Sequence, residues 1–193
     1  MALSHAQLQT AAYLALQVYQ QPADWLVQVV DGTTFICLEG SDTAIDWRRN
    51  AEFIFTASDT HAGFENYATL LMAQMWAAGV PLPAGQPVVV TGHSLGGAVA
   101  TIMAAQLQDQ LPLLELVTFG SPRPGGRKLR KRLRVPHHRY RHASDIVPEM
   151  PLWVAGYRHT APVIQLEPSS PLHALRGIAD HDMGVYQRLI HEA

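Results

Sequence analysis

Apolar and polar positions near the start of the chain change from a helical to an extended period. From Met1 to Gln21 apolar residues are interspersed with Gln, Ser and Thr, which predicts an amphipathic helix. Trp25–Val30 and Thr33–Leu38 are β-rich runs joined by Asp31-Gly32, a pair typical of two-residue hairpin turns. We therefore expect a helix followed by an antiparallel hairpin.

Further along, short apolar runs alternate with helical patterns. Buried strands are expected over Pro87–Thr91 and Leu113–Phe119, and a helix over Ala98–Leu111 between them. The other expected elements are a helix over Gly63–Ala78, a short basic helix over Arg127–Arg134, strands around Arg139–His142 and over Tyr157–Leu166, and a last helix over Met183–Ile190. This alternation predicts an α/β fold with a mostly parallel central sheet, helices on both faces and the hairpin at its N-terminal side.

Length and composition set the broad class. A chain of 193 residues fits one domain, 1–193, and its 48% apolar and 16% charged residues are typical of a globular protein rather than a disordered or fibrous one. The single cysteine, Cys37, cannot form an intramolecular disulfide and is expected to be a buried, inert thiol.

No targeting or membrane segment is apparent. The first 21 residues contain no Lys or Arg, unlike a signal peptide, and no stretch reaches the roughly 18 unbroken apolar residues of a membrane span. We therefore expect a cytoplasmic protein by default, with secretion by another route left open.

Positive charge is concentrated in one window. The net charge is −2, but nine of the fourteen Lys and Arg residues lie between Arg123 and Arg141, where no acidic residue occurs. The run Arg127–Arg134 could bind nucleic acid or an anionic membrane. Leu129 and Leu133, four residues apart, favour a simpler interpretation as a solvated helix, so a nucleic-acid partner is not expected.

Three histidines close together in the sequence, His137, His138 and His142, are candidate metal ligands. No cysteine or carboxylate completes a zinc-like spacing around them. We expect neither a metal nor another cofactor.

The pentapeptide Gly92-His93-Ser94-Leu95-Gly96 lies where a predicted buried strand meets a predicted helix. This setting is that of a nucleophile elbow, which holds a serine in a strained turn with its hydroxyl exposed above the sheet edge. Ser94 is therefore the candidate nucleophile, and the Leu95 N–H is a candidate oxyanion donor. The alternative is a glycine-rich helix start in which Ser94 is only an N-cap.

A serine nucleophile needs a base and an acid, which follow it in that fold in the order serine, acid, histidine. Asp145, just past a strand, is the preferred acid, because sheets of this kind place their sites at the carboxyl ends of strands. Glu149 and Glu167 are alternatives, whereas Asp109 is expected to face solvent.

Two histidines remain open as the base. His181 follows a long loop that can carry it back to Ser94, and it is favoured over His173. His93 adjoins the serine on a tight turn and is expected to pack in the core, with substrate contact as the alternative.

Six separated segments resemble the class 3, or fungal-type, lipase family over about residues 34–186. They are Phe35–Ser41 with Asp46-Trp47, His61-Ala62-Gly63-Phe64, Thr91–Gly97, Thr118–Gly125, Asp145-Ile146-Val147-Pro148 and His181-x-Met183-x-x-Tyr186. The resemblance implies an α/β-hydrolase fold without a cofactor and a triad of Ser94, Asp145 and His181. It also implies that Ser41 supplies the second oxyanion donor.

The resemblance further implies a serine carboxylic-ester hydrolase, a lipase or esterase, that cleaves acylglycerols and contacts a lipid interface. A phospholipase, a feruloyl-type esterase and an inactive binding module with the same fold are the alternatives. Residues 42–60 occupy the place of a lid. The candidates for lid or substrate contact are Trp47, Phe53, Phe55, His93 and Trp153.

Overall fold

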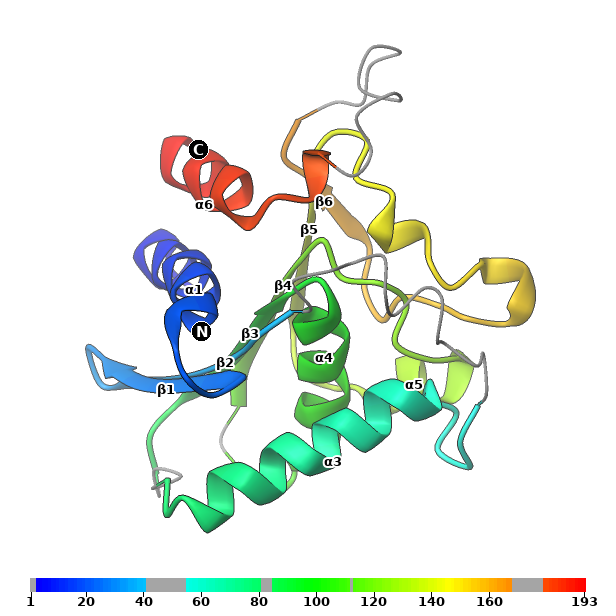
Figure 1. The fold of residues 1–193 in the computed structure, drawn as a ribbon, viewed down its shortest axis with the longest axis horizontal. Helices are drawn as coiled ribbons and strands as arrows, with labels where there is room; N and C mark the ends of the chain where they lie inside the picture. Colours follow the sequence, from blue (N-terminus) through cyan, green and yellow to red (C-terminus); the bar gives the residue numbers. More distant parts are fainter. Residues whose placement is uncertain (1–2, 41–54, 81–84, 112, 168–178) are drawn as a thin grey trace.

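A computed structural model describes residues 3–40, 55–80, 85–111, 113–167 and 179–193 (Figure 1). Its centre is a six-stranded sheet in the order β1-β2-β3-β4-β5-β6. The strands are β1 Trp25–Val30, β2 Thr33–Leu38, β3 Val88–His93, β4 Leu113–Phe119, β5 His137–Arg141 and β6 Val163–Gln165. The helices are α1 His5–Gln17, α3 Ala62–Ala77, α4 Leu95–Leu107, α5 Arg127–Arg132 and α6 Met183–Glu192, with 3-10 turns that include η2 Val147–Glu149, η3 Trp153–Ala155 and η5 Ala179–His181.

The sheet has the predicted strand directions. β1 pairs with β2 in antiparallel register through the Asp31-Gly32 turn, and every later neighbouring pair is parallel. Both turn residues have positive φ, 47° for Asp31 and 75° for Gly32, as a tight hairpin turn requires. The predicted α/β class with an N-terminal hairpin is therefore confirmed.

Two helical layers cover the two faces of the sheet. Alternate residues of β2 point to opposite faces, because side chains alternate along a strand. Ile36 and Leu38 join the core beneath α3 and α4, whereas Phe35 and Cys37 join the core beneath α1 and α6. Figure 1 shows α1 and α6 side by side on one face and α3 with α4 on the other.

The first helix is held by a capping box. Ser4 accepts a hydrogen bond from the backbone N–H of Gln7, whose side chain bonds the Ser4 backbone in return. Four small or apolar residues of α1 are buried against the sheet: Ala11, Ala12, Leu14 and Ala15. The amphipathic helix predicted for this segment is confirmed.

One predicted strand is much shorter in the structure. The strand expected over Tyr157–Leu166 is reduced to β6, because Arg158 instead pairs with Gly125 on another loop. His181 lies in η5, just before the last helix, and Asp182 caps α6 by accepting from the Val185 N–H. The shortened strand does not change the layer order. Among the described residues, no helix is long and apolar enough to cross a bilayer.

Candidate active site

Ser94 occupies a strained turn between β3 and α4. Its backbone has φ 55° and ψ −129°, and its N–H donates to the Phe119 carbonyl at 3.0 Å. A non-glycine residue with positive φ costs free energy and marks a site held by its surroundings. The Ser94 side chain makes no capping hydrogen bond to α4. The hydroxyl is therefore not used as a helix cap.

Backbone segments pack so closely around the serine that there is little space for side chains at the neighbouring glycines. A Cβ on Gly92 would lie 2.5 Å from the Gly96 carbonyl carbon, so strand and helix cross in contact. A Cβ on Gly40 would lie 3.0 Å from the Ser94 Cβ, which shows that the segment after β2 reaches the serine. Ser94 itself is 1% exposed.

Asp145 and His181 meet at the carboxyl edge of the sheet. His181 Nδ1 lies 2.8 Å from Asp145 Oδ2, and both side chains are buried. The other carboxylate oxygen, Oδ1, accepts from the Val147 N–H at 2.9 Å. The carboxylate is thus fixed by β5's exit loop and faces the imidazole with one oxygen.

Tyr186 is a second ligand of the same carboxylate. Its hydroxyl donates to Asp145 Oδ2 at 2.6 Å and accepts from the His142 N–H at 2.9 Å. Burial, followed by the nearby Asp145 charge, raises the pKa of Tyr186 well above its usual value, so the phenol keeps its proton. The motif that begins at His181 includes Tyr186 but predicts no role for it, because the contact between Tyr186 and residue 145 is tertiary.

The Asp145–His181 pair lies against the turn that carries Ser94. The His181 ring is 4.5 Å from the ring of His93, the residue next to Ser94. Gly120, with φ 57°, lies beneath the pair, where a Cβ would come within 2.9 Å of His181 and 2.7 Å of Asp145. Ser94 Oγ and His181 Nε2 are both buried and without a hydrogen-bond partner among the described residues. Neither the hydroxyl of the candidate nucleophile nor the second ring nitrogen of the imidazole is therefore engaged by another described residue.

His93 has a structural partner. Its Nδ1 lies 2.8 Å from the Tyr19 hydroxyl, and the ring is 5% exposed. Burial lowers the pKa of His93 well below its ordinary value, so the imidazole is neutral. A neutral, hydrogen-bonded ring at this place suits the predicted packed histidine.

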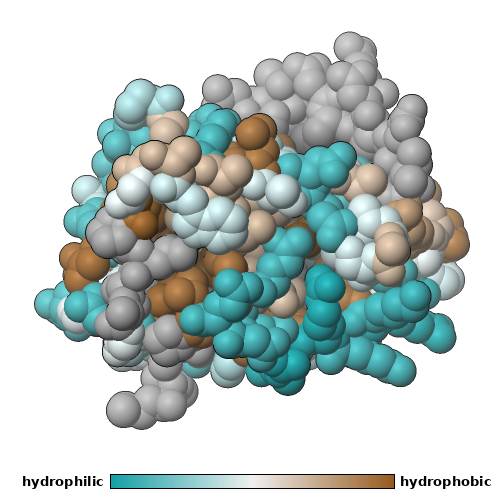
Figure 2. Space-filling model, turned by 90° about the horizontal axis from the view of Figure 1, so that it is seen from below, coloured by the Kyte–Doolittle hydropathy of each residue, from teal (hydrophilic) through white to brown (hydrophobic). Residues whose placement is uncertain are grey.

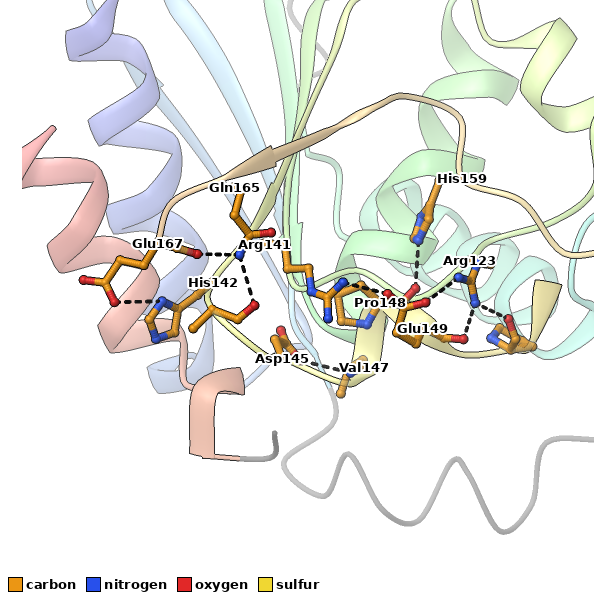
Figure 3. Close-up of polar contacts among 12 residues, drawn as sticks. Arg123, Arg141, His142, Asp145, Val147, Pro148, Glu149, His159, Gln165 and Glu167 are labelled. Atoms are coloured by element: carbon orange, nitrogen blue, oxygen red, sulfur yellow. Dashed lines mark hydrogen bonds and ion pairs between the residues drawn. The ribbon is translucent and has the colours of Figure 1, made fainter. Parts of the chain in front are cut away.

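Two arginines anchor the loop that follows Asp145 (Figure 3). Arg123 donates to Glu149 Oε2 at 2.7 Å, and also to the backbone carbonyls of Glu149 and Pro151. Arg141 donates to Glu149 Oε1 at 2.6 Å. Glu149, an alternative acid from sequence, is therefore a structural carboxylate, and these charges keep its pKa low against the effect of burial.

A further carboxylate joins the acid loop to the histidine segment. Asp180, 5% exposed, accepts from the Ser144 N–H at 3.1 Å, so the residues just before Asp145 and His181 are themselves bonded. The His142 ring lies 3.9 Å from Asp180 and 3.7 Å from Glu167. Glu167, the other alternative acid, faces His142 rather than His181.

Some of the remaining site residues predicted from sequence are described by the structure, and others are not. Phe55 stacks on Tyr157 with ring centroids 4.2 Å apart, whereas Trp153 is 61% exposed on η3. Asp109 is exposed and paired with Arg134, as expected of a solvent-facing residue. Four predicted site residues lie outside the described residues: Ser41, Trp47, Phe53 and His173.

The histidines of β5 point to different partners. His137 is hydrogen-bonded to Thr118 and Thr160, at 2.9 and 2.7 Å, whereas His138 pairs with Glu115 on the other face. Burial lowers the pKa of His137 to about 3. Among the described residues, no group of three or more His, Cys, Asp or Glu side chains could hold a metal ion.

Comparison with known proteins places this geometry in a family. The model of the family described as lipase (class 3) matches residues 35–155. A secreted mono- and diacylglycerol lipase 1 of Fusarium solani is 35% identical over 145 residues, which are 68% of this chain and 43% of that protein. Secreted mono- and diacylglycerol lipase A of Penicillium cyclopium is 42% identical over 77 residues, 38% of this chain and 25% of the relative.

The fold agrees with solved structures. The crystal structure of a fungal lipase superposes with a TM-score of 0.65 and 26% identity, covering 76% of this chain and 60% of that one. The chain spans less than half the length of these curated relatives. The family match covers more than half of the chain and includes the Ser94 turn and the Asp145 loop, so this protein belongs to the class 3 lipase family, with the α/β-hydrolase fold.

Proposed function

We propose that this protein is a serine carboxylic-ester hydrolase that cleaves acylglycerols through an acyl-Ser94 intermediate. One arrangement carries the proposal: a strained serine at the end of β3 lies beside a buried His181–Asp145 pair. The hydroxyl of Ser94 and Nε2 of His181 are both buried and have no hydrogen-bond partner among the described residues. This combination supplies a nucleophile, a base and an orienting acid.

In the proposed reaction, Ser94 Oγ attacks the ester carbonyl carbon while its proton passes to His181 Nε2. Asp145 accepts the Nδ1 proton in its hydrogen bond, which leaves the Nε2 lone pair facing the serine. The C–O bond then breaks, and the leaving alkoxide takes the proton from His181. Water attacks the acyl-serine by the same path and releases the fatty acid.

The oxyanion is assigned to the backbone at the start of α4. Leu95 is the first helical residue, so its N–H has no intrahelical acceptor, and the helix dipole favours negative charge there. We assign the second donor to Ser41 on the motif resemblance, and the close approach of Gly40 to Ser94 supports that choice.

The substrate class and the compartment follow the relatives by inference. Proteins of Fusarium solani and Penicillium cyclopium that match this chain are named secreted mono- and diacylglycerol lipases. We therefore propose partial acylglycerols as substrates, met at a lipid surface, and action outside the cell in place of the cytoplasm expected from sequence. Fractionation of the producing organism tests the location.

Covalent labelling tests the chemistry. A fluorescent alkyl phosphonate should label the folded chain at Ser94, and Ser94→Ala should abolish both labelling and ester turnover. Ser144→Ala, at a partly buried serine whose backbone rather than hydroxyl bonds Asp180, is the matched control. A folded chain in which Ser94 stays unlabelled, or in which Ser94→Ala retains turnover, overturns the proposal.

A p-nitrophenyl ester series from acetate to palmitate, with emulsified di- and triacylglycerol, tests the substrate. A rate that jumps when the acylglycerol exceeds its solubility supports action at a lipid surface. A short-chain optimum without such a jump contradicts it and indicates a soluble esterase.

A further inference from the structure

An apolar turn projects from the loop that follows Asp145. Three consecutive residues of this turn, around η3, are exposed: Leu152 at 53%, Trp153 at 61% and Val154 at 69%. Exposed apolar groups gathered in one place mark interaction sites more often than single exposed residues do. The turn is therefore a candidate site for a partner that can take up apolar side chains.

The helix α5 presents cations that have no carboxylate partner in the part of the chain that the structure describes. Arg127, Lys128, Arg130 and Lys131 are exposed, and no described acidic side chain lies within 4.0 Å of their charged groups. Leu129 alone anchors the helix in the core. The solvated helix expected from sequence is thus correct in its packing, and its charge stays available.

Arg158 joins these two features into one surface. Its backbone N–H donates to Gly125, next to Gly126, the N-cap of α5. Its guanidinium donates to the Trp153 carbonyl at 2.6 Å and lies 5.9 Å from the centre of the Trp153 ring. The apolar turn and the start of α5 are therefore neighbours.

The figures agree with these contacts. In Figure 1 the gold turn at η3 and the label of α5 lie on the same side of the molecule. Figure 2, turned about the horizontal axis, shows hydrophilic side chains along its lower right and hydrophobic ones beside them at the right edge. We call Leu152, Trp153, Val154, Arg158 and the four exposed cations of α5 the basic-apolar surface.

We propose that the basic-apolar surface binds anionic lipid membranes, with the η3 side chains entering the interface and the cations contacting the headgroups. A tryptophan with aliphatic neighbours suits the boundary between headgroups and acyl chains, and flanking Lys and Arg residues add attraction to anionic lipid. Because the whole chain carries a net charge of −2, this attraction arises from the local surface. Nucleic acid would use the cations and leave Leu152 and Val154 without a role, so lipid is the better match.

The position of the surface relates it to the proposed chemistry. The η3 turn follows Asp145 in the same loop, which Arg123 and Glu149 hold in place. A membrane bound there therefore contacts the loop that carries Asp145. Binding itself needs no ester cleavage, so the inference can be tested apart from the proposed function.

Vesicle flotation with the full chain carrying Ser94→Ala measures binding without hydrolysis. The vesicles are phosphatidylcholine alone or phosphatidylcholine mixed with phosphatidylglycerol. We expect binding to the anionic vesicles only, weakened by added salt, with a blue shift of tryptophan fluorescence. Arg127→Gln should weaken binding about fivefold, the effect of about one cation at a charged surface. Trp153→Gln should weaken it about tenfold or more.

Matched controls lie elsewhere on the molecule. Arg188→Gln removes an exposed arginine of α6, and Trp76→Gln removes a tryptophan of α3 that is 54% exposed. Neither should change vesicle binding. Circular dichroism verifies that each variant is folded.

Several outcomes overturn the inference. They are equal binding to neutral and anionic vesicles, no binding at low salt, and losses that are the same in the control variants. Retention on DNA without binding to vesicles would assign the cations to nucleic acid instead. The two proposals can fail separately. If phosphonate does not label Ser94 but vesicle binding still depends on the basic-apolar surface, the proposed function is contradicted and this inference stands.

Discussion

Arginines of one short sequence window have opposite environments in the fold. Arg123 is 9% exposed and donates to two backbone carbonyls and one carboxylate, whereas Arg127 and Arg130 on α5 extend into solvent. Arg139 is also buried, and burial, with Arg141 and Arg123 nearby, lowers its pKa to about 10. The density of basic residues along the chain thus overstates the positive charge on the surface, because some of these arginines are buried and bonded inside the protein.

This difference concerns how much each polar group contributes to stability. A buried donor that loses its partner leaves a desolvated group behind, whereas an exposed one regains water. The same contrast extends to Asp145, which lies at the centre of the buried contacts of the site. Substitutions matched between the two regions can therefore test it.

The largest effect is expected at Asp145. Asp145→Asn should lower kcat for ester hydrolysis by about 10⁴-fold, because an amide no longer holds the His181 tautomer or stabilises the imidazolium. Steady-state kinetics with a soluble ester, beside urea unfolding of the same variant, separates catalysis from folding. A loss smaller than about tenfold would move the acid to another residue.

Arg123 and Arg130 allow a direct comparison of the two environments. Arg123→Met should lower the free energy of unfolding by about 3 kcal/mol, because carbonyls of Glu149 and Pro151 lose their donor. Arg130→Met should change it by about 0.5 kcal/mol or less. Urea denaturation measures both, and equal effects would contradict the distinction.

Two tyrosine–aspartate hydrogen bonds provide a second matched pair. Tyr186→Phe removes the buried donor to Asp145 and orphans the His142 N–H, so stability should fall by about 2 kcal/mol and kcat about tenfold. Tyr67→Phe removes an exposed bond of similar length to Asp24, 2.7 Å, and should cost about 0.5 kcal/mol or less. If kcat falls without a change of the pH–rate profile or of stability, Tyr186 acts otherwise than by positioning Asp145.

A separate effect, measured as a slope rather than as a single free energy, is a change in the pH dependence of stability. Burial lowers the pKa of His159 to about 3, below the ordinary value of 6.5, so between these values the unfolded chain binds more protons. Its contribution is therefore complete above pH 6.5 and is lost as the pH falls towards 3, at up to about 1.4 kcal/mol per pH unit.

His159→Gln keeps a donor for the Pro148 carbonyl and should reduce that slope by about one proton. Exposed His5 provides the control, because His5→Gln makes the same change of residue type outside the core. Chemical denaturation at several pH values decides between the two outcomes. An unaltered slope in His159→Gln would mean that other groups, such as His137, carry the dependence.

Local pattern was sufficient for most elements and for the nucleophile turn. The apolar run Val88–Val90 and the glycines around Ser94 are local properties, and the structure has β3 and α4 joined at that serine. Where the pattern failed, long-range contacts prevailed: Arg158 bonds Gly125, and the predicted strand Tyr157–Leu166 is reduced to the three residues of β6. Segment order also placed an acid and a histidine after the serine, without showing that they meet.

The sequence by itself determined the α/β class, the serine turn and a short set of acid and base candidates, because period, turn chemistry and chain order are encoded locally. Only the tertiary structure decided that Asp145 faces His181 and that Tyr186 bonds the same carboxylate. It also decided that Glu149 forms ion pairs with Arg123 and Arg141. The tertiary structure likewise decided which arginines are buried and that Arg158 links Trp153 to the segment just before α5. These outcomes depend on residues far apart in the chain, whose contacts form only when the sheet brings the ends of its strands together.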